Sequence, residues 1–163
     1  MKFQKRIIIW GYVITLSALL LFCGLQKAEY ERIYDIDIAN ISDKTSEFEF
    51  GVDAPVDSDY IVVSGYAYQV KEPYKSIDYK IVLLNQKTGK AFYVKTQPVE
   101  RKDLVEADPD LQFAKIGIYG RVSKAAGAFS ENYYEICFLL RINSEESIVH
   151  TGHYMGTPEE NTN

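Results

Sequence analysis

The chain has 163 residues, of which 47% are hydrophobic, and its formal net charge at pH 7 is −5. Three of its 18 basic residues precede the first apolar segment, so the remainder carries 15 basic residues against all 23 acidic ones. Nucleic acids and anionic lipid surfaces attract positive patches, so this balance excludes nucleic acid from the expected partners.

The first predicted element is a membrane-spanning helix over residues 7–25, which contain no charged residue. About 19 residues at about 1.5 Å rise per residue span about 28 Å, which matches the hydrocarbon core of a bilayer. Basic residues precede this segment, so we expect residues 1–6 in the cytoplasm and the C-terminal part outside the plasma membrane. These basic residues are Lys2, Lys5 and Arg6.

A cleaved signal peptide and a lipoprotein signal are the alternatives to an uncleaved signal anchor. A cleaved signal has a shorter apolar core, followed by a site with small residues. A lipoprotein signal places a small residue before the modified cysteine, whereas Phe22 precedes Cys23 here. The pattern favours the uncleaved anchor, with lipidated Cys23 as the second interpretation.

Small residues recur along the predicted helix at Gly11, Thr15 and Ala18, with spacings of i, i+4 and i+7. This spacing places them on one helix face, where a neighbouring helix can approach closely. The helix is therefore either a simple tether in the lipid bilayer or a contact with a membrane-protein partner.

After a polar connector over residues 26–34, which can continue the helix, apolar residues alternate with acidic ones, at Ile36 and Ile38 and again at Phe48 and Phe50. This period of two predicts two strands before residue 51. Turn-forming residues are dense over 51–55 and 57–59. Beyond them the sequence predicts strands over residues 60–69, 77–84, 91–96, 113–122, 134–142 and 147–154, a hairpin connection over 85–90, a helical turn within 99–107, and a frayed tail over 156–163.

About eight short strands with almost no helix predict an all-β, antiparallel β-sandwich of Ig-like or jelly-roll-like type over residues 35–155. A closed barrel remains the alternative. Gly65 indicates a bulge or a close backbone approach, and Gly117 and Gly120 are expected to break the strand over 113–122. Cys137 is expected to be a buried thiol without a disulfide to Cys23. The predicted core consists of Ile61, Val63, Ile81, Leu83, Phe92, Val94, Ile116, Ile118, Ile136 and Phe138.

The order SGYAYQV, IVLLNQKTGKAFYVKT, IGIYGRVS and YYEICFLLRI, behind one membrane helix, resembles small extracytoplasmic β-sandwich domains of bacterial envelope proteins. Some of those domains serve surface-polysaccharide systems. The resemblance covers residues 60–154 and implies an envelope location and a non-catalytic role. It carries over no site residue.

Two pairs of residues are the candidate ligand or partner face. Tyr66 and Tyr68 share a strand face opposite Ile61 and Val63, and tyrosine suits both sugar rings and protein interfaces. Arg101 and Asp103 can grip a sugar or a partner. The structural alternative is that Asp103 caps the helical turn while Arg101 pairs with a neighbouring strand.

No residue pattern predicts a cofactor, a metal site or a catalytic group. The carboxylates Glu106, Asp108 and Asp110 alternate but lack the glycine and the distal glutamate of a calcium loop. His150 and His153 split faces on a strand, and no cysteine or carboxylate lies at ligand spacing in the sequence. No nucleophile lies in a hydrolase motif.

The sequence therefore leaves three functional hypotheses, the first of which it favours. The first is a membrane-anchored, non-catalytic binding module for a cell-surface polysaccharide or a glycan-handling partner. The second is a small accessory subunit of a membrane protein complex. The third is an envelope enzyme, for which the sequence gives no support.

Overall fold

The computed structural model describes residues 2–30, 32–57, 60–69, 76–107, 111, 115–124, 126 and 133–156. The chain divides into two compact units, Met1–Glu31 and Arg32–Asn163. Each unit is described by itself.

The first unit is one helix, α1 (Lys2–Tyr30). Within it, Ile8–Glu29 is long and apolar enough to cross a membrane, and none of this segment is buried. Such a segment near the N-terminus is a membrane anchor or a signal. The helix continues past residue 25 into the predicted polar connector, because Gln26 to Tyr30 contains no helix breaker.

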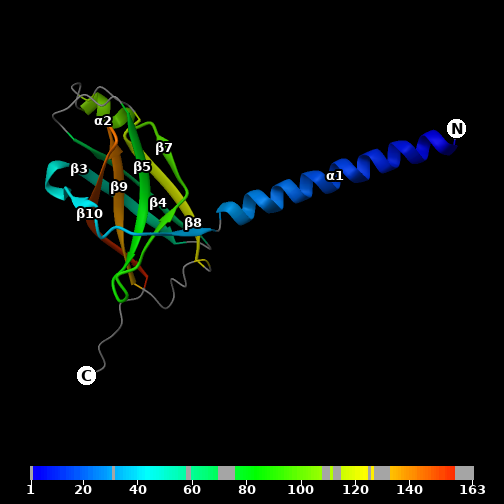
Figure 1. Cartoon of the computed structure of the whole chain (residues 1–163). Coiled ribbons are helices and arrows are strands. Elements are labelled where there is room, and N and C mark those ends of the chain that lie inside the picture. Colours follow the sequence, from blue (N-terminus) through cyan, green and yellow to red (C-terminus); the bar gives the residue numbers. More distant parts are fainter. Residues whose placement is uncertain are drawn as a thin grey trace. The chain divides into compact units, whose positions relative to one another are not determined.

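The second unit is mostly β structure in two sheets, with two short helices (Figure 1). Its elements are β1 (Ile33–Ile36), β2 (Ser42–Asp43), η1 (Thr45–Glu47), β3 (Glu49–Asp57), β4 (Tyr60–Tyr68), β5 (Ile77–Asn85), β6 (Ala91–Val94), β7 (Thr96–Val99), α2 (Lys102–Ala107), β8 (Gly117–Ser123), β9 (Tyr133–Ile142) and β10 (Glu145–Gly156).

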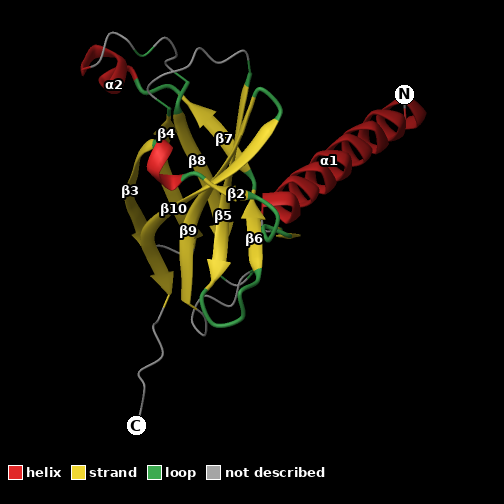
Figure 2. Cartoon of the chain, turned by 60° about the vertical axis from the view of Figure 1, so that its left-hand side comes forward, coloured by secondary structure: helices red, strands yellow, loops and turns green. Residues whose placement is uncertain are grey.

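The six-stranded sheet has the order β1-β6-β5-β9-β10-β2, and the four-stranded sheet has the order β3-β4-β8-β7 (Figure 2). Among the described pairs, only β10 and β2 are parallel, so the expectation of a fully antiparallel fold is wrong at this edge. The apolar strand β9 lies inside its sheet, between β5 and β10.

One apolar core is shared by the two sheets, with Ile61 and Val63 from β4 in the same cluster as Ile81 from β5 and Phe138 from β9. Nine of the ten predicted core residues are buried. The tenth, Phe92, is partly buried and packs against the same cluster. The alternation along each strand therefore predicted the inward faces correctly.

A second apolar cluster lies on the outer face of the six-stranded sheet. It contains Val82, Cys137 and Leu139, which alternate with the inward residues. Because β1 and β2 lie on opposite edges of the sheet, the chain between them crosses this face. Ile38 and Ile41 of that crossing segment pack against the cluster and help to bury the Cys137 side chain completely.

Residues 91–96 form two elements, although one strand was predicted. The chain leaves the six-stranded sheet after Val94 and enters the four-stranded sheet at Thr96. The Thr96 hydroxyl accepts a hydrogen bond from the Ile81 N–H at 2.9 Å and donates one to the Val94 carbonyl at 2.9 Å. This side chain replaces the backbone partner that Ile81 loses where the strand changes sheets.

The predicted turn at residues 51–55 is wrong, because they belong to strand β3. Phe50 and Val52 point toward the core cluster and extend the apolar alternation that begins earlier. Pro55 is tolerated because β3 is an edge strand and its register against β4 shifts between Asp53 and Val56. Residues 58–59 lie outside the described residues.

Two predictions about glycines have clear outcomes. Gly65 is a close approach, because a Cβ there would lie 2.3 Å from the Gly51 carbonyl oxygen, and the β4–β8 register continues through it without a shift. Gly117 and Gly120 do not break their strand, since β8 runs continuously from Gly117 to Ser123. Residues 113 and 114 of the predicted strand lie outside the described residues.

Candidate functional site

Strand β4 presents its tyrosines on the face opposite its core residues, as the alternation predicted. The Tyr66 and Tyr68 rings stack with centroids 6.0 Å apart and an interplanar angle of 26°. Tyr68 is buried, and its hydroxyl donates a hydrogen bond to Glu49 Oε2 at 2.7 Å. Tyr66 is the more exposed member of the pair.

Arg101 lies beside Tyr66, with its guanidinium carbon 5.0 Å from the ring centroid. Its Nε and Nη2 donate to the two carboxylate oxygens of Asp103 at 3.0 and 2.9 Å, and its Nη1 reaches Asp53 Oδ2 at 3.4 Å. The hydrogen bond from Arg101 lowers the pKa of the Asp103 carboxyl. Arg101 thus pairs chiefly with Asp103 and also reaches Asp53 on β3, which agrees with one part of the structural alternative, a pairing across to a strand.

Two glycines let these side chains lie flat on the sheet. Tyr66 is registered between Gly51 on β3 and Gly117 on β8. A Cβ on Gly51 would lie 2.7 Å from Tyr66 Cε1, and a Cβ on Gly117 would lie 2.8 Å from Arg101 Cγ. The absence of side chains at both positions makes room for the ring and for the arginine stem.

We call Tyr66, Tyr68 and Arg101 the tyrosine face. A second pair extends it along the same side of the four-stranded sheet, because Arg121 lies over the Tyr60 ring with its guanidinium carbon 3.8 Å from the centroid. Tyrosine and arginine are the residue types enriched at the centres of protein interfaces.

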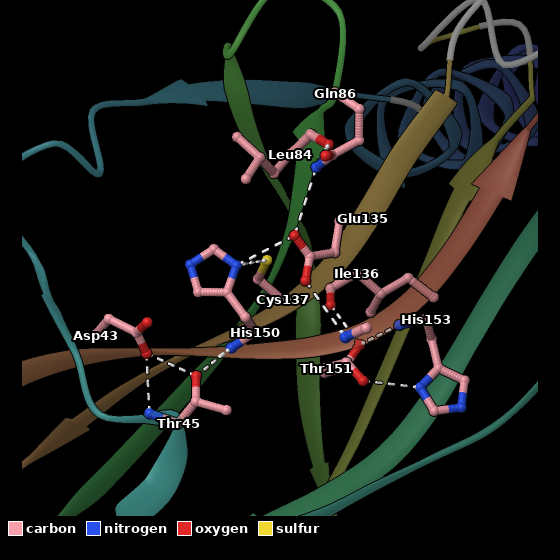
Figure 3. A network of polar contacts seen from close by, with 11 residues as sticks. Asp43, Thr45, Leu84, Gln86, Glu135, Ile136, Cys137, His150, Thr151 and His153 are labelled. Carbon is pink, nitrogen blue, oxygen red and sulfur yellow. Dashed lines mark hydrogen bonds and ion pairs between the residues drawn. The ribbon is translucent and has the colours of Figure 1, made fainter. Parts of the chain in front are cut away.

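A second group of side chains, which can bind protons or metal ions, lies on the outer face of the six-stranded sheet (Figure 3). Glu135 and Cys137 are two residues apart on β9, and His150 lies directly opposite Cys137 on β10. The Nδ1 atom of His150 is 3.1 Å from Glu135 Oε2 and 3.6 Å from Cys137 Sγ.

Neighbouring groups hold this cluster in place. The Glu135 carboxylate accepts hydrogen bonds from Gln86 Nε2 at 3.4 Å and from the Gly152 N–H at 3.3 Å. The His150 N–H donates to Thr45 Oγ1 at 2.8 Å. Glu135 and Cys137 are buried, whereas about a third of the His150 side chain is exposed.

This geometry does not suit nucleophilic catalysis. Burial raises the pKa of the Cys137 thiol well above its usual range, and the nearby Glu135 charge raises it further. A catalytic histidine uses one ring nitrogen for the nucleophile and the other for the orienting carboxylate. Here both groups face the same nitrogen, Nδ1, so no proton relay forms.

The remaining predicted residues are not brought together. His153 lies beyond the register shift in β10, and its Nδ1 contacts the Thr151 carbonyl at 3.1 Å. Glu106 is exposed on α2, while Asp108 and Asp110 lie outside the described residues. On α1, the Thr15 hydroxyl donates to the Gly11 carbonyl at 2.9 Å. The packing of Gly11, Thr15 and Ala18 against a partner stays a prediction.

The sequence did not predict the cluster of Glu135, Cys137 and His150, because His150 is separated from the other two residues in the sequence and reaches them only through strand pairing. The available signal was the two-residue spacing of Glu135 and Cys137, combined with a hairpin turn at Asn143 and Ser144. Both turn residues have positive φ, at 48° and 77°.

No family model, curated protein or solved structure matches this chain.

Proposed function

We propose that this protein is a single-pass envelope protein, N-terminus inside, whose extracytoplasmic β domain is a non-catalytic binding module. The apolar helix α1 and the basic residues before it support the anchor and its orientation. The resemblance to envelope domains supports a cell-surface polysaccharide or a glycan-handling protein as the ligand. We further infer an Ig-like or jelly-roll-like β-sandwich, since two separate sheets share one core.

The observation that carries this proposal is the tyrosine face. Tyr66 and Arg101 are partly exposed on the outer side of a sheet whose other side is core. Rigid aromatic rings and a preorganised guanidinium lose little entropy on binding, which is why such residues act as interface anchors. Asp103 and Asp53 preorganise Arg101.

Between the two ligand classes, the geometry favours a protein. A sugar stacks on an open aromatic face, but the Tyr66 ring already contacts Gly51 and Arg101 and stacks beside Tyr68. A protein partner can instead bury the edge of the ring together with the arginine stem. We therefore propose a protein partner of the envelope and keep polysaccharide binding as the outcome that would revise this choice.

The experiment is a mild-detergent pull-down of the tagged full-length chain from its native membrane, with mass spectrometry and glycan analysis of the eluate. Tyr66→Ala should reduce partner recovery, because an interface anchor contributes about 2 kcal/mol or more. Tyr93→Ala is the matched control. The Tyr93 ring also stacks on a tyrosine, with its centroid 4.9 Å from that of Tyr34, but it lies on the other sheet. Recovery that is equal in both variants would overturn the proposal.

A small accessory subunit of a membrane complex is the second candidate. Gly11, Thr15 and Ala18 recur on one face of α1, and a face of small residues lets a neighbouring helix approach closely. The same pull-down separates the candidates, because Gly11→Leu would then abolish recovery while Tyr66→Ala would not.

A further inference from the structure

The side chains of Glu135, Cys137 and His150 converge on one point at the outer face of the six-stranded sheet (Figure 3). One carboxylate oxygen, the sulfur and one imidazole nitrogen all lie within 4.8 Å of one another. Ligand atoms around a tetrahedral ion with bonds of about 2.0–2.3 Å are about 3.3–3.8 Å apart. We propose that these three residues bind one zinc ion.

The donor set selects the class of metal. Cysteine sulfur, histidine nitrogen and a carboxylate oxygen together are ligands of zinc and similar transition ions, whereas calcium and magnesium require oxygen ligands. The ligands come from neighbouring positions of one hairpin, Glu135 and Cys137 on β9 and His150 on β10. The site is thus built on a rigid part of the sheet.

At His150 Nδ1 one proton can serve only one of the two neighbouring groups, Glu135 Oε2 or Cys137 Sγ. If Nδ1 of His150 carries its proton and donates to Glu135, it has no lone pair left to accept from the Cys137 thiol. If Nδ1 is unprotonated, two acceptors face each other at 3.1 Å. A cation binds all three lone pairs at once and removes this conflict.

Outer groups already orient the ligands as a metal site requires. The Gly152 N–H donates to Glu135 Oε1 at 3.3 Å, which leaves Oε2 as the oxygen nearest to His150. Gln86 Nε2 also donates to Oε2, at 3.4 Å. About a third of the His150 side chain is exposed, so this ligand lies at the solvent edge of the cluster.

Binding balances both charge and protons. The Cys137 S–H bond breaks as the sulfur–zinc bond forms, and the proton leaves to solvent. The thiolate and the Glu135 carboxylate then carry two negative charges against the two positive charges of zinc. The buried site is left without net charge, which limits the cost of desolvation.

The test titrates full-length protein in mild detergent with cobalt(II), a spectroscopic substitute for zinc, under reducing conditions. The background is Cys23→Ser, so that Cys137 is the only thiol in the chain. The expected result is one ion per chain and a thiolate-to-cobalt charge-transfer absorption that zinc abolishes by displacement. Zinc should also raise the Tm of the protein.

Substitutions then identify the ligands. Cys137→Ser should abolish the charge-transfer absorption, and Glu135→Gln or His150→Gln should weaken the affinity by more than about tenfold. His153→Gln is the matched control and should bind cobalt as the parent does, because its ring lies against the Thr151 carbonyl. Metal-free Tm values confirm that each variant is folded.

Two results would overturn the proposal. One is cobalt or zinc bound at well below one ion per chain with no charge-transfer absorption in the Cys23→Ser protein. The other is an equal loss of affinity in His150→Gln and His153→Gln, which would indicate unspecific surface binding by histidine. If Cys137→Ser does not fold, the isosteric Glu135→Gln variant and the His150→Gln variant decide the question.

Discussion

His150 lies directly opposite Cys137 across the β9–β10 pair, with Nδ1 3.6 Å from Sγ. The two-residue turn at Asn143 and Ser144 fixes this register, because residues at equal distances from a two-residue turn face each other. Glu135 shares the face of Cys137 because it precedes it by two residues. One hairpin therefore assembles all three side chains of the cluster.

Gly152 lies at the register shift that follows His150, and its backbone N–H donates a hydrogen bond to the Glu135 carboxylate. Gly152 has φ +67°, and Gly89 in the β5–β6 turn has φ +69°; a Cβ on either would meet no atom within 4 Å. Gly152→Ala and Gly89→Ala should each lower the free energy of unfolding by about 1 kcal/mol, since an L residue disfavours this conformation. Urea unfolding of the metal-free protein measures this loss.

Only Gly152→Ala should also weaken cobalt binding, because its N–H donates to the Glu135 carboxylate. Gly89→Ala controls for the loss of stability itself. The same affinity in both variants would show that the Gly152 hydrogen bond does not position the carboxylate.

Gly65 has no room for a methyl group, because the paired strand β3 and Phe138 of the facing sheet both lie close to it. A Cβ there would lie 2.3 Å from the Gly51 carbonyl oxygen and 2.9 Å from Phe138 Cζ. Both belong to packed strands, so Gly65→Ala should destabilise the domain by about 2–3 kcal/mol. Ser64→Ala, which loses a 3.1 Å hydrogen bond to Asp53, should cost about 0.5 kcal/mol or less. Similar unfolding midpoints for the two variants would contradict this account.

Period-two alternation predicted most strands and their buried faces, because each face depends only on neighbouring residues. The same local rule predicted that Tyr66 and Tyr68 point away from Ile61 and Val63. It misread residues 51–55, because glycine, aspartate and proline are typical of turns and their place here depends on pairing. Gly51 is needed beneath the Tyr66 ring, which only the β3–β4 register reveals.

Other features depend on contacts that no local pattern encodes. The parallel pair of β10 with β2 forms because the chain crosses the outer face of the sheet and buries Ile38 and Ile41 there. Strand β2 has only two residues, which is too few for a periodic signal. The metal cluster was missed for the same reason, since His150 reaches Cys137 only through the hairpin register.

Asp43, at the end of that crossing segment, should contribute stability that depends on pH. Its carboxylate accepts hydrogen bonds from the Thr45 hydroxyl at 2.6 Å and the Thr45 N–H at 2.9 Å, which lower its pKa below the ordinary 3.8. A lowered folded pKa stabilises the fold above about pH 4, and this contribution is lost as the pH falls through the folded pKa.

Asp43→Asn should therefore lower the free energy of unfolding near neutral pH but have little effect below the folded pKa, where the native carboxyl is protonated too. Urea unfolding of both proteins, at pH values above and below the folded pKa, measures the difference in their free energy of unfolding. In a Thr45→Val background the pH-dependent part should shrink, because the hydroxyl is the largest cause of the shift. A cost of Asp43→Asn that is independent of pH would contradict this assignment.

The membrane anchor is tested at the middle of its apolar segment. Leu16 is 60% exposed on α1, so a substitution there alters the surface of the helix. Leu16→Arg should oppose insertion by about 2.5–3.5 kcal/mol, whereas the control Leu16→Phe should be neutral. Alkaline extraction of membranes should then release Leu16→Arg and retain Leu16→Phe. Equal retention, together with a mature mass that lacks residues 1–22, would instead identify the segment as a cleaved lipoprotein signal ending before Cys23.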